Sequence, residues 1–152
     1  MSVLWQLLKR AWLALLLKPR LRTPAATQGP NLTDVDVLSR FLTSSGHFAR
    51  GKKRVKGAAF LPAADKLTST FHTTGLDAEA KWRLGDAHLA GRHFYGSGDV
   101  TVGDVRAVGL DVDPNYEPER HVGIWGWPNE RQEQMSLAQQ LAATATLSLR
   151  PQ

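Results

Sequence analysis

Five basic side chains fall within seven positions of one short segment, and they are the strongest candidates for chemistry in this sequence. They are Arg50, Lys52, Lys53, Arg54 and Lys56, and His47 comes just before them. Lysine and arginine neutralise the phosphates of a nucleic-acid backbone. Glycines at positions 46, 51 and 57 would let backbone N–H groups approach an anion. The segment therefore predicts a phosphate-binding loop, and the alternative is a basic turn that only meets water.

Aromatic and basic residues near this segment extend the prediction. Phe48 and Phe60 flank it in the sequence, and aromatic rings next to a basic groove are typical of proteins that stack on nucleic-acid bases. We therefore predict that Phe48 or Phe60 stacks on a base. Arg120, beside His121, is predicted to lie at the rim of the same site.

Two histidines are candidates for acid–base catalysis. His72 begins a His-x-Thr pattern that resembles one half of the two-histidine phosphoesterase signature, but His121-Val122-Gly123 lacks the hydroxyl residue of the second half. Two histidines near a basic cluster could move protons on a phosphodiester. His72 and His121 are therefore the predicted catalytic residues if the chain is an enzyme. The alternative is that both are ordinary strand residues, and we favour a binding protein.

Acidic residues do not form a recognisable ligand set. Asp111 and Asp113 would lie on one face of a strand, with His121 downstream, but this spacing matches no standard metal site. We expect no metal and no cofactor. The sequence Trp125-Gly126-Trp127 would place both indoles on one strand face, where we expect them to pack in the core. The alternative is an exposed platform for a base or a protein partner.

The elements that must position these residues follow from periodicity and capping. We expect a short helix over 35–42 after Thr33, a helix over 77–90 capped by Asp77 and closed by Gly91, and a helix that starts at 128–129. For this last helix we predict a capping box with Gln132 and an inward face formed by Met135, Ala138, Leu141, Ala142 and Ala145. Strands are expected over 54–61, 66–74, 120–127 and 147–149, and short strands with tight turns over 92–113. The predicted fold class is α+β, a single compact domain with a mostly antiparallel sheet and two main helices.

The positive net charge of the chain, +5, comes from its first residues. Residues 1–31 contain five basic and no acidic side chains, and the rest carries equal numbers of both. We therefore divide the chain into a basic amphipathic helix or tail over 1–22, a linker over 23–32 and the α+β domain over 33–150. A nucleic-acid function inferred from net charge alone would apply to the tail, not to the domain.

The N-terminal segment has an apolar helical stripe that includes Leu4, Trp5, Leu8 and Trp12. Its uninterrupted apolar run covers only 11–17, which is shorter than the roughly 20 residues that cross a membrane. One expectation is peripheral membrane contact through residues 3–17. The alternatives are an overextended start site or passive tail, and a secretory signal.

Several stretches resemble small bacterial proteins to which no activity is assigned. They are 40–42, 56–62, 69–76 and 120–128, and the resemblance spans most of 35–150. It implies a domain boundary but no function. The chain has no cysteine, which fits a reducing compartment, and we predict a cytoplasmic location with peripheral membrane binding as the alternative. The predicted function is binding of a phosphate-bearing partner, most simply nucleic acid; the alternatives are a protein-interaction module or a histidine-dependent phosphodiester or nucleotide enzyme.

Overall fold

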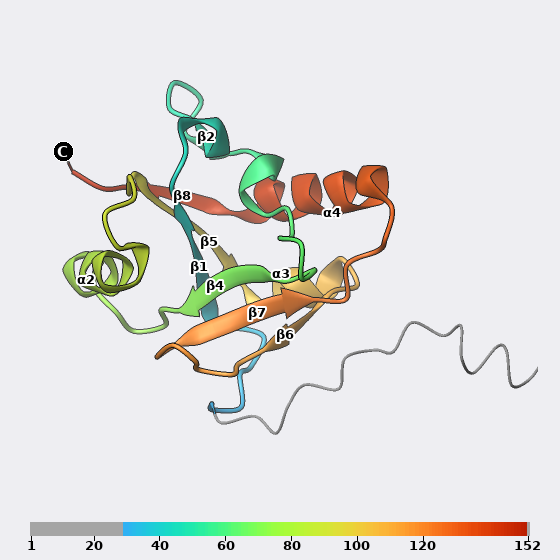
Figure 1. Ribbon diagram of the computed structural model, residues 1–152, viewed down its shortest axis with the longest axis horizontal. Helices are drawn as coiled ribbons and strands as arrows, with labels where there is room; N and C mark the ends of the chain where they lie inside the picture. The colour runs from blue at the N-terminus through green and yellow to red at the C-terminus, as the bar shows by residue number, and fades with distance from the viewer. Residues whose placement is uncertain (1–28, 152) are drawn as a thin grey trace, which may run out of the picture.

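A six-stranded antiparallel sheet organises the chain in the computed structural model, which describes residues 29–151 (Figure 1). The strand order is β6-β7-β4-β1-β5-β8. Its strands are β1 (Val37–Leu42), β4 (Thr68–His72), β5 (Gly96–Thr101), β6 (Asp111–Asp113), β7 (His121–Trp125) and β8 (Thr146–Leu149). Two further strands, β2 (Phe48–Ala49) and β3 (Arg54–Val55), form a hairpin of their own.

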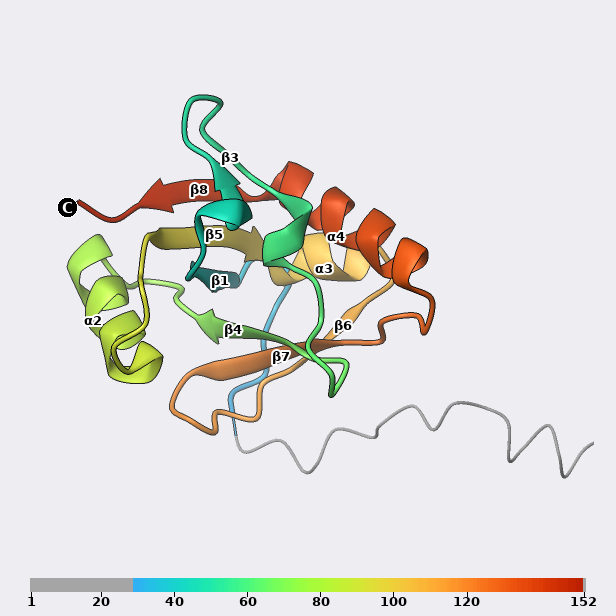
Figure 2. The same cartoon turned by 45° about the horizontal axis from the view of Figure 1, so that its top comes forward.

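Three α-helices and two 3₁₀ turns complete the described fold. The helices are α2 (Ala78–Leu89), α3 (Val102–Ala107) and α4 (Arg131–Thr144), and the turns are η1 (Ser45–His47) and η2 (Gly57–Ala59). Asp77 caps α2 by accepting a hydrogen bond from the N–H of Ala80, at 2.8 Å. Thr101 and Asp104 form a capping box on α3. Figures 1 and 2 show α2 and α4 at opposite ends of the molecule.

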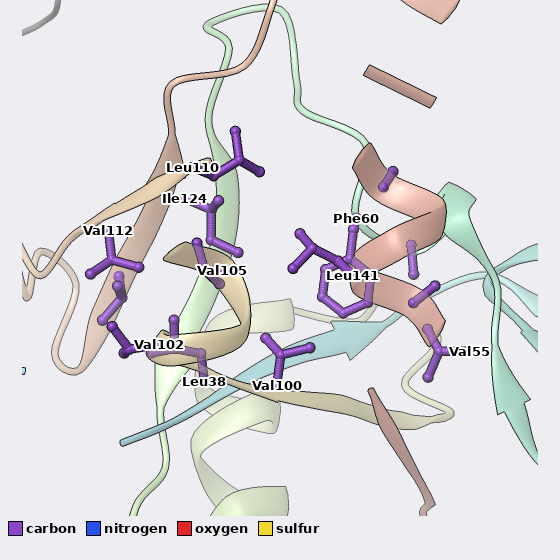
Figure 3. Packing of buried hydrophobic residues seen from close by; sticks show 14 of the residues in the cluster. Leu38, Val55, Phe60, Val100, Val102, Val105, Leu110, Val112, Ile124 and Leu141 are labelled. Atoms are coloured by element: carbon purple, nitrogen blue, oxygen red, sulfur yellow. The ribbon is translucent and has the colours of Figure 1, made fainter. Parts of the chain in front are cut away.

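The main core lies between one face of the sheet and the elements α3, α4 and η2. Because side chains alternate along a strand, Leu38, Val100, Val122 and Ile124 all point to this face. They belong to one buried cluster together with side chains of the helices and turns, including Phe60, Val102, Val105 and Leu141 (Figure 3). This layer provides most of the buried apolar area that stabilises the domain.

The opposite face of the sheet carries polar and aromatic side chains, and α2 lies against it. The Lys81 ammonium donates to Asp99 at 3.0 Å, and Asp99 also accepts from Ser39 at 2.6 Å. His88 stacks on Phe71 with ring centroids 4.9 Å apart. Gly85 is the one fully buried residue of α2. The helix is therefore held by a few polar and aromatic contacts rather than by an apolar face.

The predicted fold class is confirmed: the domain is α+β, with a mostly antiparallel sheet and two main helices. The strands predicted around β4, β7 and β8 are present, and α2 begins after Asp77 as expected. Gly91 follows the left-handed Ala90 that ends this helix. The helix predicted at 128–129 is present as α4, although it begins at Arg131.

Three predicted elements are wrong. Residues 37–42 form β1 rather than a helix, because the strand is hydrogen-bonded on both sides in the middle of the sheet, where pairing outweighs local propensity. The strand predicted over 54–61 ends at Val55, and the chain turns into η2 against α4. Residues 102–107 form the helix α3, whereas short strands and tight turns were predicted for this segment.

Details at both ends of α4 also differ from the predictions. Its N-cap is Glu130, which makes no side-chain capping bond, so the predicted capping box with Gln132 does not form. Of the predicted inward face, Ala138, Leu141 and Ala142 are buried, whereas Met135 and Ala145 are half-buried. Gln134 is buried as well, and its amide donates to the carbonyl of Pro128 at 2.7 Å.

The predicted N-terminal helix or tail over 1–22 lies outside the described residues. Of the predicted linker, residues 29–32 are described, and Leu32 packs against the core. Folded structure therefore includes at least one residue before the predicted boundary at 33. Among residues 29–151, no helix is both long and apolar enough to cross a membrane.

Candidate functional site

The basic segment forms the exposed tip of the β2–β3 hairpin. Arg50, Lys52, Lys53, Arg54 and Lys56 are all exposed. Within the described residues, none of these five side chains makes an ion pair or a hydrogen bond. The turn closes when the N–H of Lys53 donates to the carbonyl of Arg50 at 3.2 Å. These exposed cations can bind an anion, but no described side-chain contact holds them in a fixed arrangement.

The stacking role predicted for Phe48 and Phe60 is corrected by their burial. Phe48 is 6% exposed and packs against Tyr95 with ring centroids 5.5 Å apart, and Phe60 is completely buried. Both rings anchor the hairpin and η2 to the core cluster. Both rings are close to the basic residues along the chain, but the rings are buried and the cations are exposed.

Of the other predicted rim residues, His47 lies at the base of the hairpin, where its carbonyl accepts the backbone N–H of Lys56 at 2.8 Å, whereas Arg120 lies on another part of the chain. Arg120 lies just before β7, and its Nε–H donates to the carbonyl of His72 at 2.6 Å. His47 lies in η1, where its Nδ1 is buried without a partner in the described structure. Burial lowers the pKa of His47, and the nearby guanidinium groups of Arg40 and Arg92 lower it further.

The two candidate catalytic histidines lie on opposite faces of the sheet. His72 alternates with Phe71 along β4, whereas His121 is directly opposite Phe71 on β7 and shares its face. His72 is hydrogen-bonded to the Tyr116 hydroxyl and, at 3.1 Å, to Asp36. The structure therefore does not bring His72 and His121 to one reacting group, and the shared two-histidine chemistry has no support in this geometry.

A gap between β1 and β4 creates a site that the sequence analysis did not predict. The β1–β5 ladder contains six residue pairs, but the β1–β4 ladder contains only Leu38–His72 and Ser39–Phe71. Beyond these pairs the strands separate, and the Arg40 side chain occupies the gap. Its Nε–H donates to the carbonyl of Ala59 at 2.7 Å, and a terminal N–H donates to the carbonyl of Ser69 at 3.1 Å.

The gap has a positive electrostatic character. Among the described residues, neither Arg40 nor Arg92 forms an ion pair with a carboxylate. Arg92 donates a hydrogen bond to the Thr43 hydroxyl at 3.3 Å. Burial lowers the pKa of Arg40, and the charge of Arg92 lowers it further. Arg40 is half-buried and Arg92 is exposed. An anion between two guanidinium groups that repel one another would stabilise both.

Two cavities open on either side of the Arg40 gap. One has a volume of about 260 Å³ and is lined by side chains of β1, β4 and α2 together with Arg92 and Pro118. The other has a volume of about 270 Å³ and is lined mainly by residues 61–68. Three residues, Arg40, Ser69 and His121, line both cavities. A ligand in either cavity therefore meets the same three residues.

Ser69, His121 and Asn115 form a hydrogen-bonded chain at this junction. Ser69 Oγ lies 2.8 Å from His121 Nε2, and His121 Nδ1 lies 3.0 Å from Asn115 Oδ1. Asn115 Oδ1 also accepts the backbone N–H of Glu117 at 3.0 Å, which identifies this atom as the amide oxygen. His121 Nδ1 must then carry the proton, so that Nε2 is the basic nitrogen that accepts the Ser69 hydroxyl.

The surroundings of His121 favour its neutral form. Burial lowers the pKa of His121 and His88 lowers it too, while the carboxylates of Asp113 and Asp65 act in the opposite direction. Asp113 is buried, and its Oδ1 has no hydrogen-bond partner in the described structure. A neutral imidazole with a free lone pair on Nε2 is the form that can accept a proton from a hydroxyl.

Sequence reasoning identified His121 but missed Arg40, Arg92, Ser69 and Asn115. These residues come from segments far apart in the chain, and none belongs to a recognised motif. One signal was present: Arg40 is the one charged residue inside the run 37–42, VLSRFL. A charge in the middle of a buried strand needs polar partners, and such residues are good candidates for a site.

A third cavity lies between the basic hairpin and α4. Its volume is about 630 Å³, and it is lined by Arg54, Lys56, Met135 and Gln139 among others.

Trp127 does not contribute an exposed platform, because it is 6% exposed and its indole N–H donates to the carbonyl of Ile124. Gly126, at φ +94°, ends the alternation after Trp125, which is half-buried.

Comparison with protein-family models, curated proteins and solved structures finds no match to this chain. The resemblance to small bacterial proteins therefore stays a prediction. Among the described residues, no group of three or more histidine and acidic side chains is placed to hold a metal ion. Asp99 and Asp104, for example, are engaged by Lys81 and by the cap of α3.

Proposed function

We propose that this protein binds a phosphate-bearing ligand, with the phosphate held at the Arg40 gap by Arg40 and Arg92. The observation that carries this proposal is the partly buried Arg40 guanidinium, which is hydrogen-bonded to two backbone carbonyls and paired with no described carboxylate. A guanidinium fork has further N–H groups to offer and matches the geometry of a phosphate. The adjacent cavities leave room for what the phosphate is attached to.

Calorimetric titration of the full chain with inorganic phosphate and with a nucleoside monophosphate tests this proposal. Both should bind, and Arg92→Gln should weaken binding about tenfold or more, because a charge-assisted hydrogen bond contributes about 1.5–3 kcal/mol. Arg92 is the better site to change, since Arg40 also supports two backbone carbonyls.

Arg83→Gln is the matched control for this titration. Arg83 lies on the exposed side of α2 and does not line either cavity. Equal affinities for the wild type and Arg92→Gln, or no binding of either phosphate compound, would contradict the proposal.

Nucleic-acid binding by the hairpin is the second candidate, and it was the first expectation from the sequence. It is favoured by the five exposed cations at the hairpin, which make no ion pairs within the described residues. Burial of Phe48 and Phe60 removes the stacking contribution, so binding would depend on phosphate contacts and on salt. A cytoplasmic location is part of both proposals, and peripheral membrane contact through residues 3–17 is an alternative for the full chain.

A further inference from the structure

Ser69 has the surroundings of an activated nucleophile. Its hydroxyl meets the basic nitrogen of His121 at 2.8 Å, and Asn115 orients the imidazole from the other side. Enzymes turn a weak nucleophile into a reactive one by this arrangement, in which a hydroxyl is hydrogen-bonded to a base and the base to an orienting group. Here the arrangement opens into cavities rather than into packed core, because Ser69 and His121 line both of them.

The pairing of β4 with β7 fixes this arrangement. Ser69 lies opposite Gly123, and Phe71 lies opposite His121, so Ser69 and His121 are diagonal neighbours on one face of two hydrogen-bonded strands. A side chain at position 123 would point to the same face, and the glycine there leaves this space to Leu67. The reacting atoms are therefore carried by the sheet rather than by a loop.

The two cavities indicate the class of substrate. Each has a volume of about 260–270 Å³, below the roughly 300–1,000 Å³ of pockets that hold a complete drug-sized ligand. The centre of a ligand that fills both cavities would lie next to Arg40, Ser69 and His121. A phosphodiester has this form, with a central anionic phosphorus and one ester group on each side.

We propose that Ser69, His121 and Arg40 form a phosphodiesterase centre, in which Ser69 is the nucleophile, His121 the general base and Arg40 the group that binds the phosphoryl oxygens. This inference rests on the proposed binding of a phosphate at Arg40 and adds the reaction. Asn115 is a positioning residue, since it acts through His121 and reaches no phosphorus-bound atom.

In the first step, Ser69 Oγ attacks the phosphorus while its proton passes to His121 Nε2. The bond between phosphorus and one ester oxygen breaks, and His121 returns the proton to that oxygen, so an alcohol leaves. In the second step, water attacks the phosphoserine, and His121 takes a proton from the water. The bond from phosphorus to Ser69 Oγ breaks, the hydroxyl regains its proton from His121, and a phosphomonoester is released. No oxidant or further reactant is needed.

The first test uses diisopropyl fluorophosphate on the full chain, followed by intact mass measurement and peptide mapping. An activated serine displaces fluoride and forms a stable phosphoester. We expect one modification, at Ser69, which is lost in Ser69→Ala and in His121→Ala and is retained in Ser136→Ala, a variant of an exposed serine on α4. Modification at another residue, or none in the folded wild type, would overturn the inference.

The second test measures turnover of bis(p-nitrophenyl) phosphate, p-nitrophenyl phosphate and p-nitrophenyl acetate. The diester should be hydrolysed to p-nitrophenol and the monoester, and Ser69→Ala and His121→Ala should each lower the rate about 100-fold or more. Circular dichroism and thermal unfolding establish that these variants are folded. Hydrolysis of the acetate alone, or diester turnover that survives in Ser69→Ala, would overturn the phosphodiesterase assignment.

The pH profile separates the role of Asn115 from a merely structural one. The rate of diester hydrolysis should fall as the pH drops, because His121 becomes protonated. The charged or titratable groups that act on His121 are Asp113, Asp65 and His88, and Arg40 lies at the same junction. Asn115→Asp keeps the accepting oxygen and adds a charge, so the midpoint of the profile should move to higher pH. Asn115→Leu should lower the rate, and an unchanged profile in Asn115→Asp would remove Asn115 from the site.

Failure of this inference and failure of the proposed function are distinguishable. Phosphate binding that depends on Arg92, with no labelling and no turnover, would leave a binding protein and refute the reaction. Labelling and turnover in a protein that does not bind free phosphate would refute the proposed phosphate binding. The substrate would then be bound mainly through its ester groups.

Discussion

Burial acts in the same direction on two histidines of this protein, His47 and His121. It lowers the pKa of each, and the chief cause is the loss of hydration of the charged imidazolium. For His47 the guanidinium groups of Arg40 and Arg92 add to this effect, whereas for His121 the carboxylates of Asp113 and Asp65 reduce it. Both histidines are therefore neutral in the folded protein at pH values where an unfolded chain begins to protonate them.

The stability of the domain should consequently decrease as the pH falls below about 6.5, the ordinary pKa of histidine. In this range the unfolded state binds more protons than the folded state, so acid favours unfolding, and the contribution is complete above the unfolded pKa. Urea unfolding between about pH 5.0 and 7.5 measures the slope. His47→Gln should flatten it, and the exposed His93→Gln should not. A free energy of unfolding that is constant over this range would contradict the assignment.

Helix α2 illustrates how an element can be positioned by a few contacts. It buries only Gly85 completely, and its attachment depends on the Lys81–Asp99 pair, the contact of His88 with Phe71 and a T-shaped contact of Trp82 with Phe94. Asp99 connects this pair to Ser39, whose hydroxyl is also hydrogen-bonded to Thr73 at 2.7 Å. Because His88 and Leu89 line the cavity beside Arg40, the position of α2 determines the shape of that cavity.

Lys81→Met should therefore destabilise the domain by about 1–3 kcal/mol, because it leaves the carboxylate of Asp99 without its cation. The Lys81 and Asp99 side chains are only 12% and 17% exposed. Arg83→Met is the control: Arg83 and its partner Glu79 are 71% and 82% exposed, so its effect should stay within about 0.5 kcal/mol. Chemical denaturation measures both, and equal effects of the two variants would show that the burial of the Lys81 pair is without consequence.

Elements with strong local signals were predictable from the sequence, and the site was not. The alternation of residues 66–74 and the Asp77 cap led to β4 and α2, since each depends on neighbours in the chain. The strand β1 was predicted as a helix because its partners, β4 and β5, lie far away in sequence. The junction of Arg40, Ser69, His121 and Asn115 depends on the same distant pairing, so no local pattern could have assembled it.

At the scale of the whole molecule, the sequence has two groups of basic side chains: one in residues 1–31 and one in the basic hairpin. The first 31 residues carry the entire formal net charge of +5, and the basic hairpin belongs to a remainder with equal numbers of acidic and basic side chains. A salt-dependent affinity for nucleic acid could therefore come from either group. Each cation that contacts a phosphate steepens the dependence of binding on salt concentration, which makes the source measurable.

Titration of the full chain with short single-stranded RNA across a salt series should identify the source. If the hairpin binds, Lys52→Gln with Lys53→Gln should reduce the slope of log affinity against log salt by about one to two units. Lys9→Gln with Arg10→Gln is the matched control of equal charge, and it should leave the slope unchanged. A slope reduced only by the second pair would assign the binding to the N-terminal segment and refute the hairpin proposal.

The strand order has a consequence for how the protein acquires its structure during synthesis. The first strand of the sheet along the chain, β1, lies between β4 and β5, and Ser39 meets Asp99, sixty residues later. The edge strands β6 and β8 come later still. Such non-local pairing is slow to form, since long loops must close before any contact stabilises them. On the ribosome, β1 can therefore gain its short pairing with β4 first, whereas its longer pairing with β5 must wait for residues 96–101. The Arg40 junction can assemble only after His121 has emerged.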